Sequence, residues 1–142
     1  MKTLRQILEE KGTDVFSVSP DDTVLAAIKA MADHDIGALV VLDREMLVGI
    51  VTERHYARRV FLKGKSSPKT QVKDIMTTPV VCADPSQSTD QGLALMTEKK
   101  IRHLPVINEN QVIGIVSIGD LVKSKISDQD FVIDQLERYI SG

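Results

Sequence analysis

Apolar and polar positions follow the same order in two stretches of the chain. Residues 20–57 and 85–122 align without a gap at a constant offset of 65 positions. A repeat at a fixed offset indicates that one structural unit has been copied, and a copy of roughly 60 residues is marginal as an independent domain. We therefore expect two similar lobes that share a core. The identical pairs include Pro20 and Pro85, Met31 and Met96, Ile36 and Ile101, Leu39 and Leu104, Val41 and Val106, and Gly49 and Gly114.

Within each copy the periodicity predicts the order strand, helix, strand, strand, helix. The helix shows apolar residues at helical spacing after a Ser or Thr N-cap, and the paired strands are Val- and Ile-rich runs joined by short polar turns. In the first copy we expect strands at 15–18, 38–42 and 47–51, with helices from 24 and from 53. In the second copy we expect strands at 80–83, 104–107 and 112–116, with helices after Ser88 and from 118.

Three further segments lie outside the aligned stretches. A short helix is predicted at 3–11, and its apolar pattern recurs at 72–76 with an offset of 68. Apolar residues between Phe131 and Ile140 predict an amphipathic C-terminal helix, whose apolar face must cover either the chain itself or a partner. The expected organisation is therefore repeat 1 with the N-terminal helix at 1–62, a linker at 63–71, repeat 2 at 72–127 and the C-terminal helix at 128–142.

The composition is that of an ordinary globular protein. Of the 142 residues, 27% are charged and 42% are hydrophobic, and the formal net charge is −2, which argues against bulk nucleic-acid binding. A basic run from Arg54 to Lys73 fits either a solvated surface or an anion-binding patch. Cys82, the single cysteine, excludes a disulfide within the chain and fits a buried, inert position. Because no apolar stretch approaches the length of a membrane span or a signal sequence, we expect no membrane association and a cytoplasmic location.

The catalytic and metal-binding signatures fail on spacing. Gly64-Lys65-Ser66 resembles the end of a phosphate-binding loop, but Arg59 occupies the position that needs the first glycine. The three histidines lack metal-ligand spacing. We therefore predict no catalytic residue, no metal site and no enzymatic activity.

One junction combines groups that suit a ligand. Ser117 and Asp120 lie where the last strand of the second copy meets its last helix. A Ser followed three residues later by an acid is a capping box. The same geometry suits a nucleotide, because a helix N-terminus attracts phosphate and a carboxylate can accept both hydroxyls of a ribose. Asp120 is suited to either role.

At these residues the chain resembles the cystathionine-β-synthase (CBS) domain family, as a tandem pair or Bateman module. The motifs are Val-x-Asp-Ile-Met at 72–76, Ile-Arg-His-Leu-Pro-Val at 101–106 and Gly-Ile-Val-Ser-Ile-Gly-Asp-Leu at 114–121. The resemblance implies an α+β fold, with two βαββα repeats packed sheet to sheet as a pseudo-two-fold disc with two clefts. It also implies homodimers and regulatory binding of an adenosyl ligand such as AMP, ATP, NAD or S-adenosylmethionine, with no catalytic cofactor.

The resemblance also assigns roles to residues of the second copy. Asp120 would hold the ribose hydroxyls, and Ser117 would approach the phosphate. Arg102 and His103 match phosphate-binding positions, although an exposed pair at a helix–strand turn explains them equally well. Val80 and Val81 match the strand edge that sandwiches the base, with Thr77 or Thr78 near it. Pro105 is also among the predicted ligand contacts.

The first copy departs from this pattern. His55 replaces the expected acid three residues after Thr52, and a neutral imidazole cannot accept two hydroxyls as a carboxylate does. We predict one competent site, in repeat 2, and a possible second site in repeat 1 formed by Thr52, Arg54, His55 and Arg58. An exposed basic helix face is the other explanation for the two arginines.

Two functions of different classes remain open. The first is a sensor that binds an adenosyl ligand and transmits its occupancy. The second is a structural dimerisation module, in which Ser117 and Asp120 only cap a helix and the C-terminal helix makes the contact. The downstream protein partner is not encoded in any motif, and nucleic-acid binding has little support because aromatic residues make up only 4%.

Overall fold

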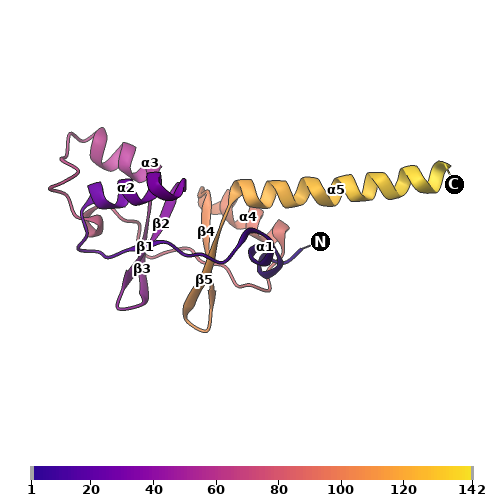
Figure 1. The fold of residues 1–142 in the computed structure, drawn as a ribbon, viewed down its shortest axis with the longest axis horizontal. Coiled ribbons are helices and arrows are strands. Elements are labelled where there is room, and N and C mark those ends of the chain that lie inside the picture. Colours follow the sequence, from indigo (N-terminus) through magenta and orange to yellow (C-terminus); the bar gives the residue numbers. More distant parts are fainter. Residues whose placement is uncertain (1, 142) are drawn as a thin grey trace. The chain divides into compact units, whose positions relative to one another are not determined.

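The computed structural model describes residues 2–141, and the predicted domain ends at 1 and 142 lie outside them. The mixed α+β composition expected from the sequence is confirmed (Figure 1). In chain order the elements of the first repeat and its flanks are α1 (Leu4–Lys11), β1 (Ser17–Val18), α2 (Val24–His34), β2 (Ala38–Asp43), β3 (Met46–Thr52), α3 (Glu53–Tyr56) and a π-helix η1 (Ala57–Phe61). Those of the second are a 3₁₀ helix η2 (Val72–Asp74), α4 (Thr89–Lys99), β4 (His103–Asn108), β5 (Gln111–Ser117) and α5 (Ile118–Ser141).

The chain divides into two compact units that do not follow the repeat boundaries. Unit 1 comprises residues 1–13, 82–108 and 113–142, and unit 2 comprises residues 14–81 and 109–112. Helix α1, which precedes repeat 1 in the sequence, therefore belongs to the unit that holds most of repeat 2. The segment 72–76, which opens repeat 2, belongs to the unit that holds repeat 1.

The two opening segments are docked in the same way. In unit 1, Leu4 N donates to Gln87 O at 2.8 Å, and in unit 2, Val72 N donates to Asp22 O at 2.8 Å. The two donors, Leu4 and Val72, are 68 positions apart, and the two acceptors, Asp22 and Gln87, are 65 positions apart, which are the offsets of the repeat. The similar sequences of the two opening segments therefore mark equivalent structural positions. At Gly114 the backbone lies so close to the Leu8 side chain of α1 that a Cβ atom would overlap it.

Unit 2 contains a three-stranded sheet in the order β1-β2-β3. β1 pairs with β2 in parallel, with Val18 opposite Val41, and β2 pairs with β3 antiparallel, with Val40 opposite Ile50. Helix α2 begins at the N-cap Thr23, whose side chain accepts from Ala26 N. The core consists of apolar residues from these elements, from η1 and from the docked opening segment: Val18, Val24, Ala27, Met31, Leu39, Val41, Val51, Val60, Val72 and Ile75.

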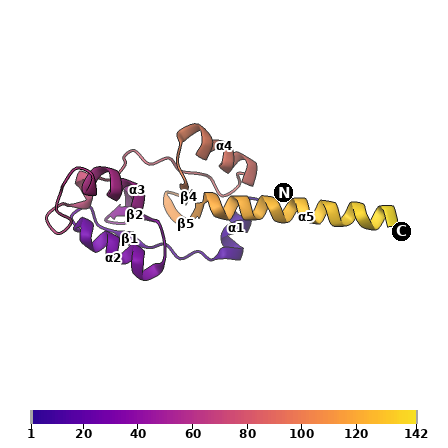
Figure 2. The same cartoon turned by 90° about the horizontal axis from the view of Figure 1, so that it is seen from above.

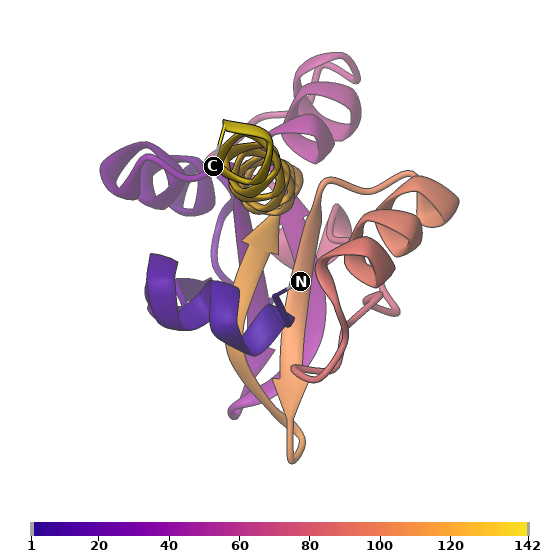
Figure 3. The same cartoon turned by 90° about the vertical axis from the view of Figure 1, so that its right-hand side faces the viewer.

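Unit 1 contains the two-stranded β4–β5 sheet, with α1 and α4 on its two sides and the beginning of α5 close to both (Figures 2 and 3). The strand expected at 80–83 is reduced to one parallel bridge between Ala83 and Val106. Ala83 N donates to Pro105 O and Ile107 N donates to Ala83 O, both at 2.9 Å. Pro79 and Pro85 flank this short segment, and neither has an amide hydrogen for a ladder.

The C-terminal helix differs from the prediction at its start. The helix expected from 118 and the separate one expected from 128 form a single helix, α5, of 24 residues (Figure 1). No proline, and no glycine between Gly119 and residue 142, interrupts the sequence there, so nothing ends the helix. Among residues 2–141, no helix is both long enough and apolar enough to cross a membrane.

Candidate functional site

The predicted capping box forms at the start of α5. Asp120 N donates to Ser117 Oγ at 3.1 Å, and Ser117 N donates to Asp120 Oδ2 at 2.8 Å. Both side chains are partly exposed, Ser117 as the last residue of β5 and Asp120 in the first turn of α5. The local sequence is therefore sufficient to place a hydroxyl and a carboxylate side by side at a helix N-terminus.

Lys11, from the last turn of α1, joins this pair. Its Nζ lies 2.7 Å from Asp120 Oδ2 and 2.8 Å from the carbonyl oxygen of Ile115. Among the described residues, both hydrogen bonds to the Asp120 carboxylate end on Oδ2, and none ends on Oδ1. Sequence reasoning missed Lys11, because the contact joins residues 109 positions apart and no local pattern signals it.

The carboxylate of Asp120 is held in its charged form. Burial acts to raise the pKa of Asp120, but the hydrogen bond from Lys11, the amide of Ser117, the Lys11 charge and the Ser117 hydroxyl outweigh it, and the pKa is lowered. A charged carboxylate accepts hydrogen bonds and cannot donate them. The group is thus prepared to receive hydroxyl donors.

Arg102 and His103 lie next to this cluster. Ile118 N, at the start of α5, donates to Arg102 O at 2.8 Å, which ties the turn before β4 to the helix. Arg102 is exposed and His103 is half-buried. Burial lowers the pKa of His103, the charges of Lys11 and Arg102 lower it further, and Asp120 opposes them. The structure therefore gathers two cations, a carboxylate, a hydroxyl and a neutral imidazole.

The other residues predicted for repeat 2 have different surroundings. Pro105 is buried within β4, in unit 1. Thr77, Thr78, Val80 and Val81 belong to unit 2. The Thr77 side chain lies 3.1 Å from His55 Nε2 and accepts a hydrogen bond of 3.1 Å from Arg59, so it is part of the cluster around the repeat 1 junction.

The repeat 1 junction keeps the capping geometry with an imidazole in place of the carboxylate. His55 N donates to Thr52 Oγ1 and Thr52 N donates to His55 Nδ1, both at 3.2 Å. Since Nδ1 accepts, the proton of a neutral ring resides on Nε2, which faces the Thr77 hydroxyl. Arg59 was not among the predicted site residues. Arg54 is half-buried and Arg58 is exposed.

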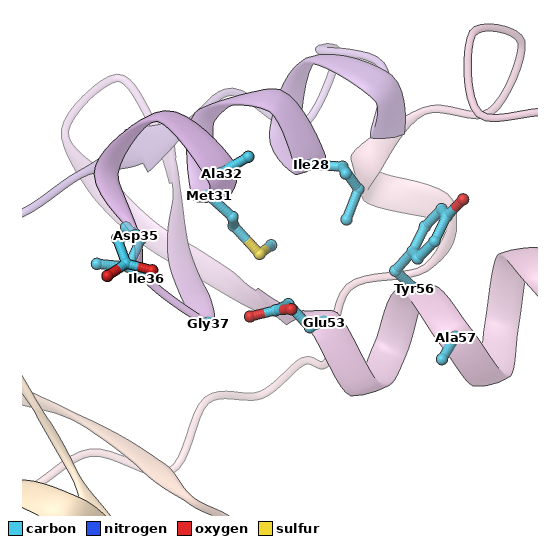
Figure 4. A pocket seen from close by; sticks show the side chains of 9 residues that line it. All are labelled: Ile28, Met31, Ala32, Asp35, Ile36, Gly37, Glu53, Tyr56 and Ala57. Carbon is cyan, nitrogen blue, oxygen red and sulfur yellow. The ribbon is translucent and has the colours of Figure 1, made fainter.

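A separate hollow of about 510 Å³ lies in unit 2 between α2 and α3 (Figure 4). Ile28 and Met31 of α2 face Tyr56 of α3 across it, and the carboxylate of Glu53 lies at its edge. None of the predicted site residues lines this hollow.

Two further observations concern the thiol of Cys82 and metal binding. Cys82 is half-buried, and burial raises the pKa of its thiol, which disfavours the reactive thiolate. Within residues 2–141, no group of three or more His, Cys, Asp or Glu side chains is arranged to hold a metal ion.

Comparison with known proteins gives consistent matches along nearly the whole chain. The family model for the CBS domain matches residues 5–61 and 72–127. The Arabidopsis thaliana CBS domain-containing protein CBSX3, mitochondrial, is 37% identical over 149 residues, which cover 99% of this chain and 72% of that protein. A solved structure of a Burkholderia ambifaria protein with CBS domains is 51% identical, with a TM-score of 0.86 over 90% of this chain and 96% of the other.

A more distant structure shows the same fold. The CBS domain pair of protein MJ0100, solved with 5′-methylthioadenosine and S-adenosyl-L-methionine, has a TM-score of 0.80 over 90% of this chain and 98% of the other. It is 23% identical in sequence, so this match supports the fold alone.

Proposed function

Because the chain belongs to the CBS domain family and carries two such domains, we propose that it is a non-catalytic regulatory module that binds an adenosyl ligand, mainly at repeat 2. A CBS pair is a regulatory module, and the finer proposal concerns the ligand and the residues that hold it. The observation that carries it is the arrangement of Ser117, Asp120 and Lys11 at the start of α5.

The chemistry of this arrangement fits a nucleotide. Asp120 Oδ1 accepts no hydrogen bond from the described residues, so it can accept the hydroxyls of a ribose, and the lowered pKa keeps the carboxylate charged for this role. Lys11 and Arg102 supply positive charge for a phosphate or for the methionine carboxylate of S-adenosylmethionine, and Ser117 supplies a hydroxyl donor. His103, with its lowered pKa, is a neutral hydrogen-bonding partner at neutral pH. Val80 and Val81 remain predictions for the base.

AMP, ATP, NAD and S-adenosylmethionine are the candidate ligands. The MJ0100 pair, which has the same fold, was solved with two adenosyl compounds, so this chemical class is the one to test first. Which member of the class binds is decided by groups beyond the ribose, so the first experiment must use a panel.

Isothermal titration calorimetry with these four compounds tests the proposal. We expect at least one to bind, and we expect Asp120→Ala to weaken that binding at least tenfold. Asp21→Ala, which removes an exposed carboxylate that pairs with Lys73 away from every predicted site residue, is the matched control and should retain binding. If none of the four binds to the wild-type protein at physiological concentrations, the proposed function is wrong.

A structural dimerisation module is the second candidate. Its support is that Ser117 and Asp120 already satisfy one another as a capping box, and Lys11 neutralises the carboxylate without any ligand. This function predicts that Asp120→Ala lowers the melting temperature while no adenosyl compound raises it. A ligand-dependent rise of the melting temperature in the wild-type protein would exclude it.

The cellular setting is also proposed. We propose a homodimer in the cytoplasm that acts on a protein partner and not on nucleic acid. Organelle fractionation tests the location directly, since one relative is named as mitochondrial. A gel-shift assay with DNA and RNA tests the exclusion of nucleic acid.

A further inference from the structure

The second half of α5 exposes an apolar stripe that the described residues do not cover. Every residue from 129 to 141 is exposed, and the buried residues of the helix are confined to its first third, at Leu121 and Ser124. Residues 129–141 include several β-branched and aromatic residues, which are mediocre helix formers. A solvent-exposed helix of this composition is marginal by itself, so its stability requires a partner.

The exposed apolar residues recur with the spacing of a coiled-coil seam. Steps of four and three residues alternate along one stripe of α5, so the stripe can be written as heptad positions a and d. The d positions are Val122, Gln129 and Leu136, and the a positions are Ile126, Ile133 and Ile140. The apolar members are 42% to 82% exposed. The stripe is about 27 Å long at the rise of an α-helix.

We propose that residues 122–140 of α5 form a parallel two-stranded coiled coil with the same helix of a second copy of the chain. β-Branched residues at a with leucine at d favour two parallel strands. This stripe has isoleucine at all three a positions and leucine at one of its three d positions, Leu136. A groove of about 410 Å³ on α5 includes Gln129, Val132 and Ile133 in its lining. Those residues are successive d, g and a positions, which form part of the hole that accepts a knob from the facing helix.

Polar residues along the stripe select the parallel orientation. In a parallel pair Gln129 faces Gln129 of the second copy, and two amides can hydrogen-bond to each other. In an antiparallel pair with the same overlap, Gln129 would face Ile133 and lose that partner. A buried polar residue that is satisfied in only one arrangement specifies that arrangement.

Charges beside the stripe are complementary in the same orientation. Lys125 is a g position and Asp130 is the e position five residues later, which face each other across a parallel pair. In the antiparallel arrangement Asp130 would lie beside Asp130 of the second copy. Lys125 Nζ also lies 3.1 Å from Asp90 of α4, but both side chains of that pair are more than a third exposed, so the contact leaves Lys125 free to reorient.

Disulfide crosslinking in the full-length chain tests this proposal. Cys82→Ser removes the single cysteine, and Ile140→Cys then places a thiol on the stripe. We expect oxidation to give a covalent dimer, because parallel helices bring the two copies of position 140 together. In the antiparallel arrangement the two thiols would be about 27 Å apart. No covalent dimer from Ile140→Cys would overturn the proposal.

Two acidic substitutions provide matched variants in the same background. Leu136→Asp places charge on the stripe and should abolish crosslinking through position 140. Phe131→Asp makes the same change on the opposite side of the helix, at a residue that is 65% exposed, and should leave crosslinking intact. Crosslinking that is insensitive to Leu136→Asp, or equally sensitive to both changes, would contradict the proposed seam. No ligand is involved, so the result is independent of the calorimetry.

Discussion

Replacement of Asp120 by alanine should destabilise the protein even without a ligand. The substitution removes the acceptor for Ser117 N and the partner of Lys11 Nζ. Loss of a helix-capping interaction costs about 1 kcal/mol, within a range of about 0.5–2 kcal/mol. The ion pair adds at most about 1 kcal/mol, because the Lys11 and Asp120 side chains are 38% and 26% exposed and solvent screens them. The expected loss in the free energy of unfolding is therefore about 0.5–3 kcal/mol.

Urea unfolding at pH 7 measures this loss, and calorimetry should show a fall in melting temperature of roughly 2–10 °C for a chain of this size. The Lys11 contribution is isolated by a double-mutant cycle of Asp120→Ala with Lys11→Met. We expect a coupling of about 0.2–1 kcal/mol that decreases in 1 M salt.

The matched control is Lys2→Met, which removes the same charge from unit 1 but breaks a pair with Glu10 instead. It should combine additively with Asp120→Ala. If Lys11→Met and Asp120→Ala are also additive, or if Asp120→Ala leaves stability unchanged, the described geometry of this cluster is wrong.

Three further predictions concern titration and packing. Burial, Lys11 and Arg102 lower the pKa of His103, and Asp120 raises it. The pKa of His103 should therefore rise in Lys11→Met and fall further in Asp120→Asn. An NMR titration in which both variants shift this pKa in the same direction would refute the described cluster. Because the unfolded chain binds that proton more tightly, His103 should make stability decrease as the pH falls below about 6.5, and His103→Gln should flatten this slope in urea unfolding between pH 7 and 5. Gly114→Ala should cost about 1–3 kcal/mol because its Cβ overlaps a buried side chain, whereas Gly119→Ala, with only an ordinary contact at 3.6 Å, should be nearly neutral in the same assay.

Local patterns predicted most elements of the fold. The turns expected between the paired strands are two-residue turns at Arg44–Glu45 and Glu109–Asn110, and all four residues have positive φ. Positive φ at both positions is the signature of a tight turn that suits the twist of paired strands. The N-cap Ser88 also lies where the sequence predicts it, and Thr23 caps the helix expected from 24. These features depend on neighbouring residues, so the sequence was sufficient.

Long-range contacts were not predictable in the same way. The docking of α1 in unit 1 depends on the fit of Leu8 against Gly114. The repeated apolar pattern indicated that α1 and the segment 72–76 are equivalent, but it did not indicate that each belongs to the unit of the other repeat. Lys11 reads as an ordinary basic residue at a helix end until the fold brings it to Asp120. The candidate site was therefore predictable as a helix cap, while its charge balance required the structure.

Calorimetry with a ribose-modified ligand tests the central claim most directly. The adenosyl compound that binds best is compared with its 2′,3′-dideoxy analogue, in the wild-type protein and in Asp120→Ala. Hydrogen bonds to a charged acceptor contribute about 1.5–3 kcal/mol, so the wild-type protein should bind the analogue roughly 10- to 150-fold more weakly. Asp120→Ala should bind both compounds with similar affinity. Equal discrimination by the two proteins would show that Asp120 does not hold the ribose.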